Sequence, residues 1–227
     1  MKKILLLLLI CFAQNLFAQK IFTYDDFNNT INENNEITII RYRGSLSSLD
    51  IPSVIDGKTV TAIGEYAFYD CDSLTSIAIP NSVTTIGDEA FSWCESLTSI
   101  IIPNSVTTIG DSTFYGCTSL TSITIPNSVT TIGSEAFSVC DSLTSITIPD
   151  SVATIGDSTF YSCDSLTSII IPNSVKTIGD YAFDGCKSLI IQCNSGSYAE
   201  KYCKKNNIKY HIMPDGLELG NYKEKDL

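Results

Sequence analysis

The residues whose chemistry stands out in this sequence are cysteines placed at a constant interval. Thiols in a regular series can form disulfides or bind a metal ion such as Zn²⁺. The chain has no C-x-x-C pair and only one histidine, His211, which disfavours a zinc site. We therefore expect no metal site and no cofactor. The series has six evenly spaced members, namely Cys71, Cys94, Cys117, Cys140, Cys163 and Cys186.

The sequence lacks the common catalytic motifs. The sequence contains no G-x-S-x-G motif, no H-E-x-x-H motif and no glycine-rich phosphate loop. Because His211 is the single histidine, a Ser–His–Asp or Cys–His arrangement would have to be built around it alone. We predict that the protein is not an enzyme and that His211 is an ordinary residue of an edge strand.

Aspartates repeat with the same spacing as the cysteines. Asp88, Asp111, Asp157 and Asp180 share one phase, and Ser134 takes this position in the remaining copy. A column of carboxylates ~5 Å apart could bind Ca²⁺, which prefers oxygen ligands. The same residues could instead cap a short helical turn in each copy, where aspartate and serine both serve. The serine in the series favours capping.

Both series belong to a 23-residue repeat. Ile77 and Ile79 flank residue 78, a period of two that predicts a half-buried strand, and Pro80 ends it. A second short strand is expected over residues 83–86. Gly87 is expected to permit a tight reversal into the short helical turn. Five copies begin at Leu74, Leu97, Leu120, Leu143 and Leu166, an imperfect copy at Leu49 and a truncated copy at Leu189.

One copy has too few apolar side chains to offset the ordering of its backbone, so neighbouring copies must stack. The sequence therefore predicts a solenoid of 23-residue leucine-rich repeats. A parallel β-sheet forms one face, and the short second strand and short helical turn form the other. An inward column of aromatic rings is expected from Phe68, Phe91, Phe114, Phe137, Phe160 and Phe183.

The distance between stacked coils predicts whether the cysteines form disulfides. Residues at one phase of adjacent coils lie about 4.8 Å apart, which exceeds the ~3.8 Å between Cβ atoms in a relaxed disulfide. The six cysteines are therefore expected to be buried free thiols that act as small hydrophobic residues. Cys193 and Cys203 lie outside this column, and a disulfide between them is left open.

The repeat "CDSLTSITIPDSVATIGDSTFYSC", from Cys140 to Cys163, resembles the BspA-type leucine-rich repeat of secreted and surface bacterial proteins. The resemblance covers about residues 44–213. The stretches Ile51–Gly64 and Ser195–Tyr210 resemble that family's first repeat and its C-terminal cap. Serines such as Ser82 and Ser105 stand where leucine-rich repeats usually carry an asparagine ladder. The resemblance implies adhesion or protein binding, often to host extracellular proteins, and no catalytic residues.

The first residues have the layout of a secretory signal peptide, with Lys2 and Lys3 before the apolar run Ile4–Ala13. Lipid attachment at Cys11 is a weaker alternative. The protein is expected to be secreted or on the cell surface, with no membrane span. The expected divisions are a signal peptide over 1–18, an N-terminal cap over 19–48, the leucine-rich-repeat solenoid over 49–193, a C-terminal helix–strand cap over 194–213 and a polar tail over 214–227.

The net charge of −11 disfavours nucleic acid as a partner, because acidic surfaces repel phosphate backbones. A protein ligand is predicted instead, such as a host extracellular-matrix or plasma protein. Two alternatives remain: an ice-binding-like hydroxyl lattice, and a periplasmic structural or interaction protein without a host ligand. The predicted binding residues are the outward strand positions Ser99, Ile101, Ser122, Thr124, Ser145, Thr147, Ser168 and Ile170.

Overall fold

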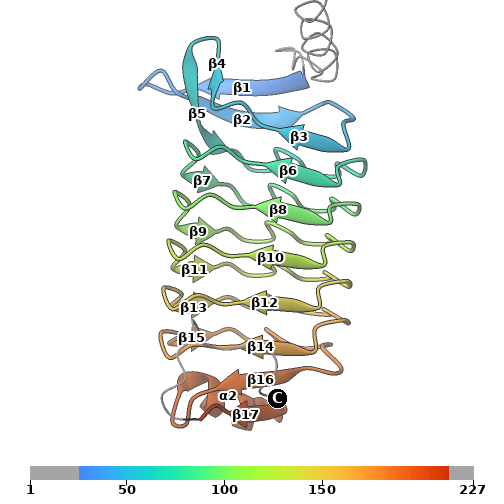
Figure 1. Cartoon of the computed structure of the whole chain (residues 1–227), viewed down its shortest axis with the longest axis vertical. Coiled ribbons are helices and arrows are strands. Elements are labelled where there is room, and N and C mark those ends of the chain that lie inside the picture. The colour runs from blue at the N-terminus through green and yellow to red at the C-terminus, as the bar shows by residue number, and fades with distance from the viewer. Residues whose placement is uncertain (1–25, 215–227) are drawn as a thin grey trace, which may run out of the picture.

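The computed structural model describes residues 26–214, in which each repeat forms one coil of a solenoid (Figure 1). The first strands of successive coils pair in parallel and build one long sheet. Figure 1 shows them in one column, with the second strands in another. The sheet consists of β3 (Ser48–Asp50), β6 (Ser76–Ala78), β8 (Ser99–Ile101), β10 (Ser122–Thr124), β12 (Ser145–Thr147), β14 (Ser168–Ile170), β16 (Ile190–Cys193) and β17 (Tyr210–Ile212).

The second strands are only two residues long and also pair in parallel. They form a four-stranded sheet, while the first of them, β7 (Thr85–Ile86), joins β5 (Lys58–Ile63). Each contributes one isoleucine to the core and leaves its threonine more exposed. The four strands are β9 (Thr108–Ile109), β11 (Thr131–Ile132), β13 (Thr154–Ile155) and β15 (Thr177–Ile178).

The imperfect first copy contains a β-hairpin near Asp56. β4 (Val54–Ile55) pairs antiparallel with β5, and the two-residue connection Asp56-Gly57 has positive φ at both positions, 46° and 74°. These angles suit the hairpin turns that follow the twist of the strands. At the N-terminal end, β1 (Phe27–Ile31) pairs antiparallel with β2 (Ile37–Tyr42), and β2 pairs in parallel with β5.

The third side of each coil is a series of hydrogen-bonded turns and contains no helical segment in the described repeats. In one coil, Glu89 and Trp93 have φ of 54° and 60°, and the equivalent residues of the other copies are also left-handed. A helix cannot contain such residues at regular intervals, so the expectation of a short helical turn is wrong. The left-handed residues turn alternate N–H groups toward the next coil, as in the bond from Glu89 N to Asp111 O (2.9 Å).

The aspartate series joins neighbouring coils instead of capping turns. Asp88 Oδ1 accepts a hydrogen bond from the backbone N–H of Asp111, and Asp111 Oδ1 accepts one from Ser134 N–H (2.9 and 2.7 Å). The capping expectation is therefore corrected. Gly87 does not serve a reversal either: a Cβ at this position would lie 2.6 Å from Glu65 N in the preceding coil, so glycine is needed for close approach.

Serines replace the usual asparagine ladder. The Ser128 hydroxyl donates to Val106 O of the preceding coil (2.5 Å), and Ser151 donates to Val129 O (2.6 Å). Ser105 makes the same bond to Val83 O. Three of the five equivalent serines therefore satisfy a carbonyl of the preceding coil, whereas the hydroxyls of Ser82 and Ser174 are buried without a hydrogen-bond partner among the described residues.

The core is a stack of phenylalanine rings, as predicted. Consecutive rings from Phe68 to Phe183 lie 5.1–5.5 Å apart and within 11° of parallel. The cysteines form a second buried column beside them, and all eight cysteines of the described chain are free, including Cys193 and Cys203.

The C-terminal end carries the one helix among residues 26–214, α2 (Tyr198–Asn206). Ser197 caps it by accepting from Glu200 N (3.1 Å), and Asn207 ends it in the left-handed conformation. Ala199, Tyr202 and Cys203 are buried in this helix, whereas Tyr198, its first residue, is 40% exposed.

Three sequence-based expectations concern parts that lie outside the described residues, namely the signal peptide, Cys11 and most of the polar tail. Within residues 26–214, no helix is both long and apolar enough to cross a membrane.

We predict that Phe137→Ala lowers the free energy of unfolding by ~3–5 kcal/mol, because the coils above and below are fixed by hydrogen bonds and cannot collapse into the gap. Phe137 is fully buried between the rings of Phe114 and Phe160. Chemical denaturation measures the change, and Thr107→Ala at an exposed position is the control. A loss below about 1 kcal/mol would show that the ring column does not support the stack.

Candidate functional site

The outward face of the eight-stranded sheet brings the predicted binding residues into two straight rows. The serine row follows the register Ser122↔Ser145↔Ser168, and the second row follows Thr124↔Thr147↔Ile170. Ile101 is the partner of Thr124 on one side and of Ala78 on the other. The sheet therefore positions all eight predicted residues on one surface, because a repeat of constant length places equal phases side by side.

Exposure is not uniform along these rows. Ile101 is 73% exposed, the largest value among the large hydrophobic residues of residues 26–214. Ser168 and Ile170 are less exposed than the equivalent residues of the central strands, because both are half-buried. The Gln192 side chain donates a hydrogen bond to Ser168 Oγ (3.0 Å). Ile170 was interpreted as a second exposed isoleucine, and that interpretation is corrected. The open part of the face lies over β8, β10 and β12.

The face carries no charge along its central strands. Between Lys58 and Lys176 the sequence contains acidic residues but no lysine or arginine. The acidic residues lie on turns and loops, so the strand positions present hydroxyl and aliphatic groups only. Asp50 and His211 occupy the two ends of the second row, the one that contains Thr124 and Thr147. The sequence analysis did not assign them to this face because they lie outside the regular copies.

A shallow hollow of about 710 Å³ adjoins the centre of the face. Thr124 and Thr147 form one side of it, and Asn127, Pro149 and Asp150 form the rim where the chain leaves the strands. A surface with a raised isoleucine beside a polar-edged hollow can accept a protein side chain together with hydrogen bonds to its backbone.

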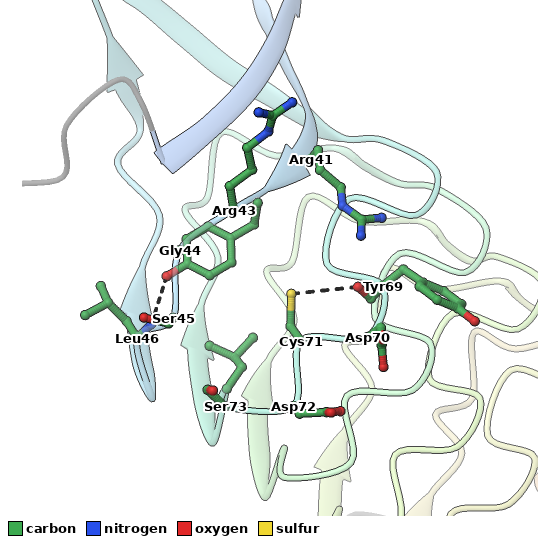
Figure 2. A pocket seen from close by; sticks show the side chains of 12 residues that line it. Arg41, Arg43, Gly44, Ser45, Leu46, Tyr69, Asp70, Cys71, Asp72 and Ser73 are labelled. Atoms are coloured by element: carbon green, nitrogen blue, oxygen red, sulfur yellow. Dashed lines mark hydrogen bonds between the residues drawn. The ribbon is translucent and has the colours of Figure 1, made fainter.

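A second pocket lies at the N-terminal end, where the thiol column begins (Figure 2). It has a volume of about 230 Å³ and is lined by Arg41, Arg43, Asp70 and Cys71 among others. These are the only two arginines in the sequence. The Leu46 N–H donates to Tyr42 Oη (3.2 Å) at one side of the pocket, and the Cys71 sulfur lies among the lining side chains, 4.0 Å from Tyr69 O (Figure 2).

Cys71 differs from the other column cysteines in its hydrogen bonding. Cys94, Cys117 and Cys140 each donate through Sγ to a phenylalanine carbonyl of the preceding coil, at 3.0–3.2 Å. Cys71 has no equivalent acceptor, because no regular coil precedes it. The neighbouring Cys94 thiol lowers the pKa of the Cys71 thiol, burial opposes this shift, and the charge of Arg41 lowers the pKa further.

Burial has the opposite effect at the centre of the column. It raises the pKa of the Cys117 thiol to about 12 and raises the pKa of Cys140 well above its ordinary value. These thiols therefore remain protonated and unreactive at neutral pH. Within residues 26–214, no group of three or more histidine, cysteine, aspartate or glutamate side chains is placed to hold a metal ion.

Residues 61–190 match the sequence profile of the BspA type leucine rich repeat region in six copies. A leucine-rich repeat protein of T. pallidum is 30% identical, with a TM-score of 0.74 over 85% of this chain and 99% of that protein. A leucine-rich repeat protein from Bacteroides ovatus ATCC 8483 is 32% identical, with a TM-score of 0.71 over 87% of this chain and 54% of that one.

A third solved structure is described as a leucine rich cell surface protein from Faecalibacterium prausnitzii A2-165. It is 33% identical, with a TM-score of 0.62 over 77% of this chain and 55% of that protein. This chain therefore spans about half the length of the latter two proteins. No curated protein matches the sequence.

We predict that a thiol-alkylating reagent modifies the native protein first at Cys71 and Cys186, the half-buried ends of the column. Cys94, Cys117, Cys140 and Cys163 should react slowly in the folded state and completely after denaturation without a reductant, because they are buried free thiols. Mass spectrometry of timed samples measures the order of modification. Disulfide-linked pairs among the four central cysteines would contradict this assignment.

Proposed function

Because the chain belongs to the BspA-type leucine-rich repeat family, we propose that it binds another protein through the outward face of the eight-stranded sheet. The observation that carries the proposal is the isoleucine Ile101, which is 73% exposed between Ala78 and Thr124 and lies beside the serine row of the sheet. Exposed apolar groups surrounded by polar ones are typical of protein contact surfaces.

The rigidity of the sheet supports the same proposal. The central strands β8, β10 and β12 are each paired on both sides, so their side chains stand at fixed spacing before a partner arrives. Little conformational entropy is then lost on binding. Apolar contact at Ile101 and hydrogen bonds from the hydroxyl rows would supply the affinity, and added salt should change it little.

The proposed setting is outside the cell. The N-terminal sequence has the composition of a signal peptide, and one similar protein is described as a cell surface protein. The repeat family and its fold are typically non-enzymatic, and we propose no catalytic activity. Adhesion to an extracellular-matrix or plasma protein of a host is the specific form of the proposal.

Ice binding is the alternative that the hydroxyl rows suggest. A lattice of Ser122, Thr124, Ser145 and Thr147 covers two strands in register. Ile101 and Ile170 interrupt the threonine row on both sides, which favours protein binding. A thermal-hysteresis activity above that of an ordinary protein of this size would favour the alternative.

The test uses a double variant, Ile101→Asp with Thr124→Asp, on adjacent strands of the exposed face. Binding to an immobilised panel of purified matrix and plasma proteins should fall at least tenfold, or about 1.4 kcal/mol. The thermal unfolding midpoint should change little, because both side chains are exposed.

The matched control is Thr107→Asp with Thr130→Asp, which adds the same charge at exposed positions beside the second strands. This control should retain binding. Loss of binding in the control alone, or the absence of any bound protein with the wild-type chain, would contradict the assignment of the sheet face.

A further inference from the structure

The turn side of the solenoid contains a hydrogen-bonded ladder that links each coil to the next. Alternate backbone N–H groups of one turn donate to alternate carbonyls of the following turn. In the last complete step, Ser158 N donates to Asp180 O and Phe160 N donates to Ala182 O, at 2.9 and 2.8 Å. Equivalent pairs of bonds join each earlier turn to the next one, from the turn of residues 64–71 to that of residues 156–163, which makes four earlier steps.

Each step has a third backbone bond, such as that from Ser162 N to Asp184 O (2.8 Å), and an aspartate carboxylate adds a fourth bond to three of the five steps. Asp157 Oδ1 accepts from Asp180 N–H (2.8 Å), so a single residue of the next coil is held through both its N–H and its C=O. Three of the bonds in such a step therefore hold a three-residue stretch of main chain in the next coil. That stretch, here residues 180–182, supplies one N–H donor and two carbonyl acceptors. The side chains of that piece take no part in these three bonds.

The step after the last turn is open. Neither Tyr181 N–H, Phe183 N–H nor the Asp180 carboxylate has a hydrogen-bond partner among the described residues 26–214. Phe183 is buried. A backbone N–H without a protein partner at the wall of a pocket is free to donate to a ligand.

These groups line a pocket of about 410 Å³ between the last turn and α2. The helix covers the ring column, because Tyr202 packs edge-on against Phe183 at 6.2 Å and its hydroxyl donates to Gly179 O (3.1 Å). It does not occupy the open step of the ladder. Lys205, Asn206 and Ile208 form the opposite wall of the pocket.

We propose that this pocket binds a peptide segment of a partner protein through its main chain, in the manner of one more turn. One ligand residue donates its N–H to Asp180 and accepts from Tyr181 N–H, and the carbonyl two residues later accepts from Phe183 N–H. That later residue must be small, because the equivalent Ala182 and Thr159 are fully buried. No aromatic residue follows it, since Tyr202 already covers Phe183.

A second copy of this chain is a poor occupant. Its first turn would have to offer Glu65 O and Ala67 O, but Ala67 O already accepts from Tyr42 N (2.7 Å), where β2 covers that end. The pocket is also separate from the sheet face, so a partner peptide can bind here whether or not that face is occupied.

The experiment measures amide hydrogen exchange of the full chain by NMR, with a synthetic peptide as the probe. The probe is the acetylated and amidated sequence of residues 132–136, Ile-Gly-Ser-Glu-Ala. In the fold this stretch makes the three bonds that the proposal requires, to Asp111 Oδ1, Ser112 N and Phe114 N at 2.7–2.9 Å. The control probe carries an N-methyl group on its serine, which removes the N–H that Asp180 would accept.

In the free protein, the amides of Tyr181 and Phe183 should exchange at least ~100-fold faster than those of Ser158 and Phe160. Millimolar probe should slow exchange at Tyr181 and Phe183 at least ~5-fold, and the N-methylated probe should not. Asp180→Ser should abolish most of this protection. Asp184→Ser, which removes the same charge from the same pocket, should retain it.

Two results would overturn the proposal. Slow exchange at Tyr181 and Phe183 in the free chain would show that the step is already filled by the protein itself. Equal effects of the two probes, or no protection from either, would show that the pocket does not recognise main chain. The Ser134 copy shows that serine is accepted at the aspartate position, so Asp180→Ser is expected to fold.

Discussion

The interaction on which this structure depends is the backbone hydrogen bond between neighbouring coils. A coil has no helix of its own to satisfy its N–H and C=O groups. Tight turns pair some of these groups within the coil, as in the bond from Val83 N to Pro80 O, and the others must find a partner in an adjacent coil. The first strands, the second strands and the turns all pair in this way. An inserted residue must loop out for the flanking strands to stay paired, as in the imperfect first copy, where Ser48 pairs with Ser76, and this favours a constant copy length in the other repeats.

The side chains are adapted to that spacing. Gly156 allows the backbone of Ser134 to approach closely, since a Cβ would lie 2.5 Å from Ser134 N. Left-handed residues such as Glu135 and Val139 (φ of 56° and 59°) carry a conformational cost because their φ is positive. The hydrogen bonds that their N–H groups donate to the next coil offset this cost. The same rigid spacing produces the flat outward rows, so the candidate binding surface is a consequence of the stacking.

Much of the fold could be predicted because it repeats. The constant length of the copies, the alternation at Ile77 and Ile79, and the proline that follows indicate a stack of short strands, and the register confirms it. The phase of Phe137 places it in the ring column for the same reason. Distance along the stack also led to the correct interpretation of the cysteines as free thiols.

The turns could not be predicted in the same way, because their conformation depends on bonds to the next coil. Asp88 next to an apolar stretch has the local pattern of a helix cap, yet its carboxylate pairs with Asp111 of the following copy. The open step at Phe183 and the partial cover of Ile170 by its neighbours belong to the end of the stack, where the repeat stops and its pattern carries no information.

The most direct test of the stacking account compares two deletions within the repeats. Removal of residues 120–142 takes out one whole copy and leaves every later group in phase. Removal of residues 120–141 leaves one extra residue between two coils. Circular dichroism and thermal unfolding should show a folded protein with a cooperative transition for the first deletion and a lower unfolding midpoint for the second, because the extra residue must loop out or disturb the pairing of those two coils. Equal disruption by both deletions would contradict the claim that inter-coil register determines the fold.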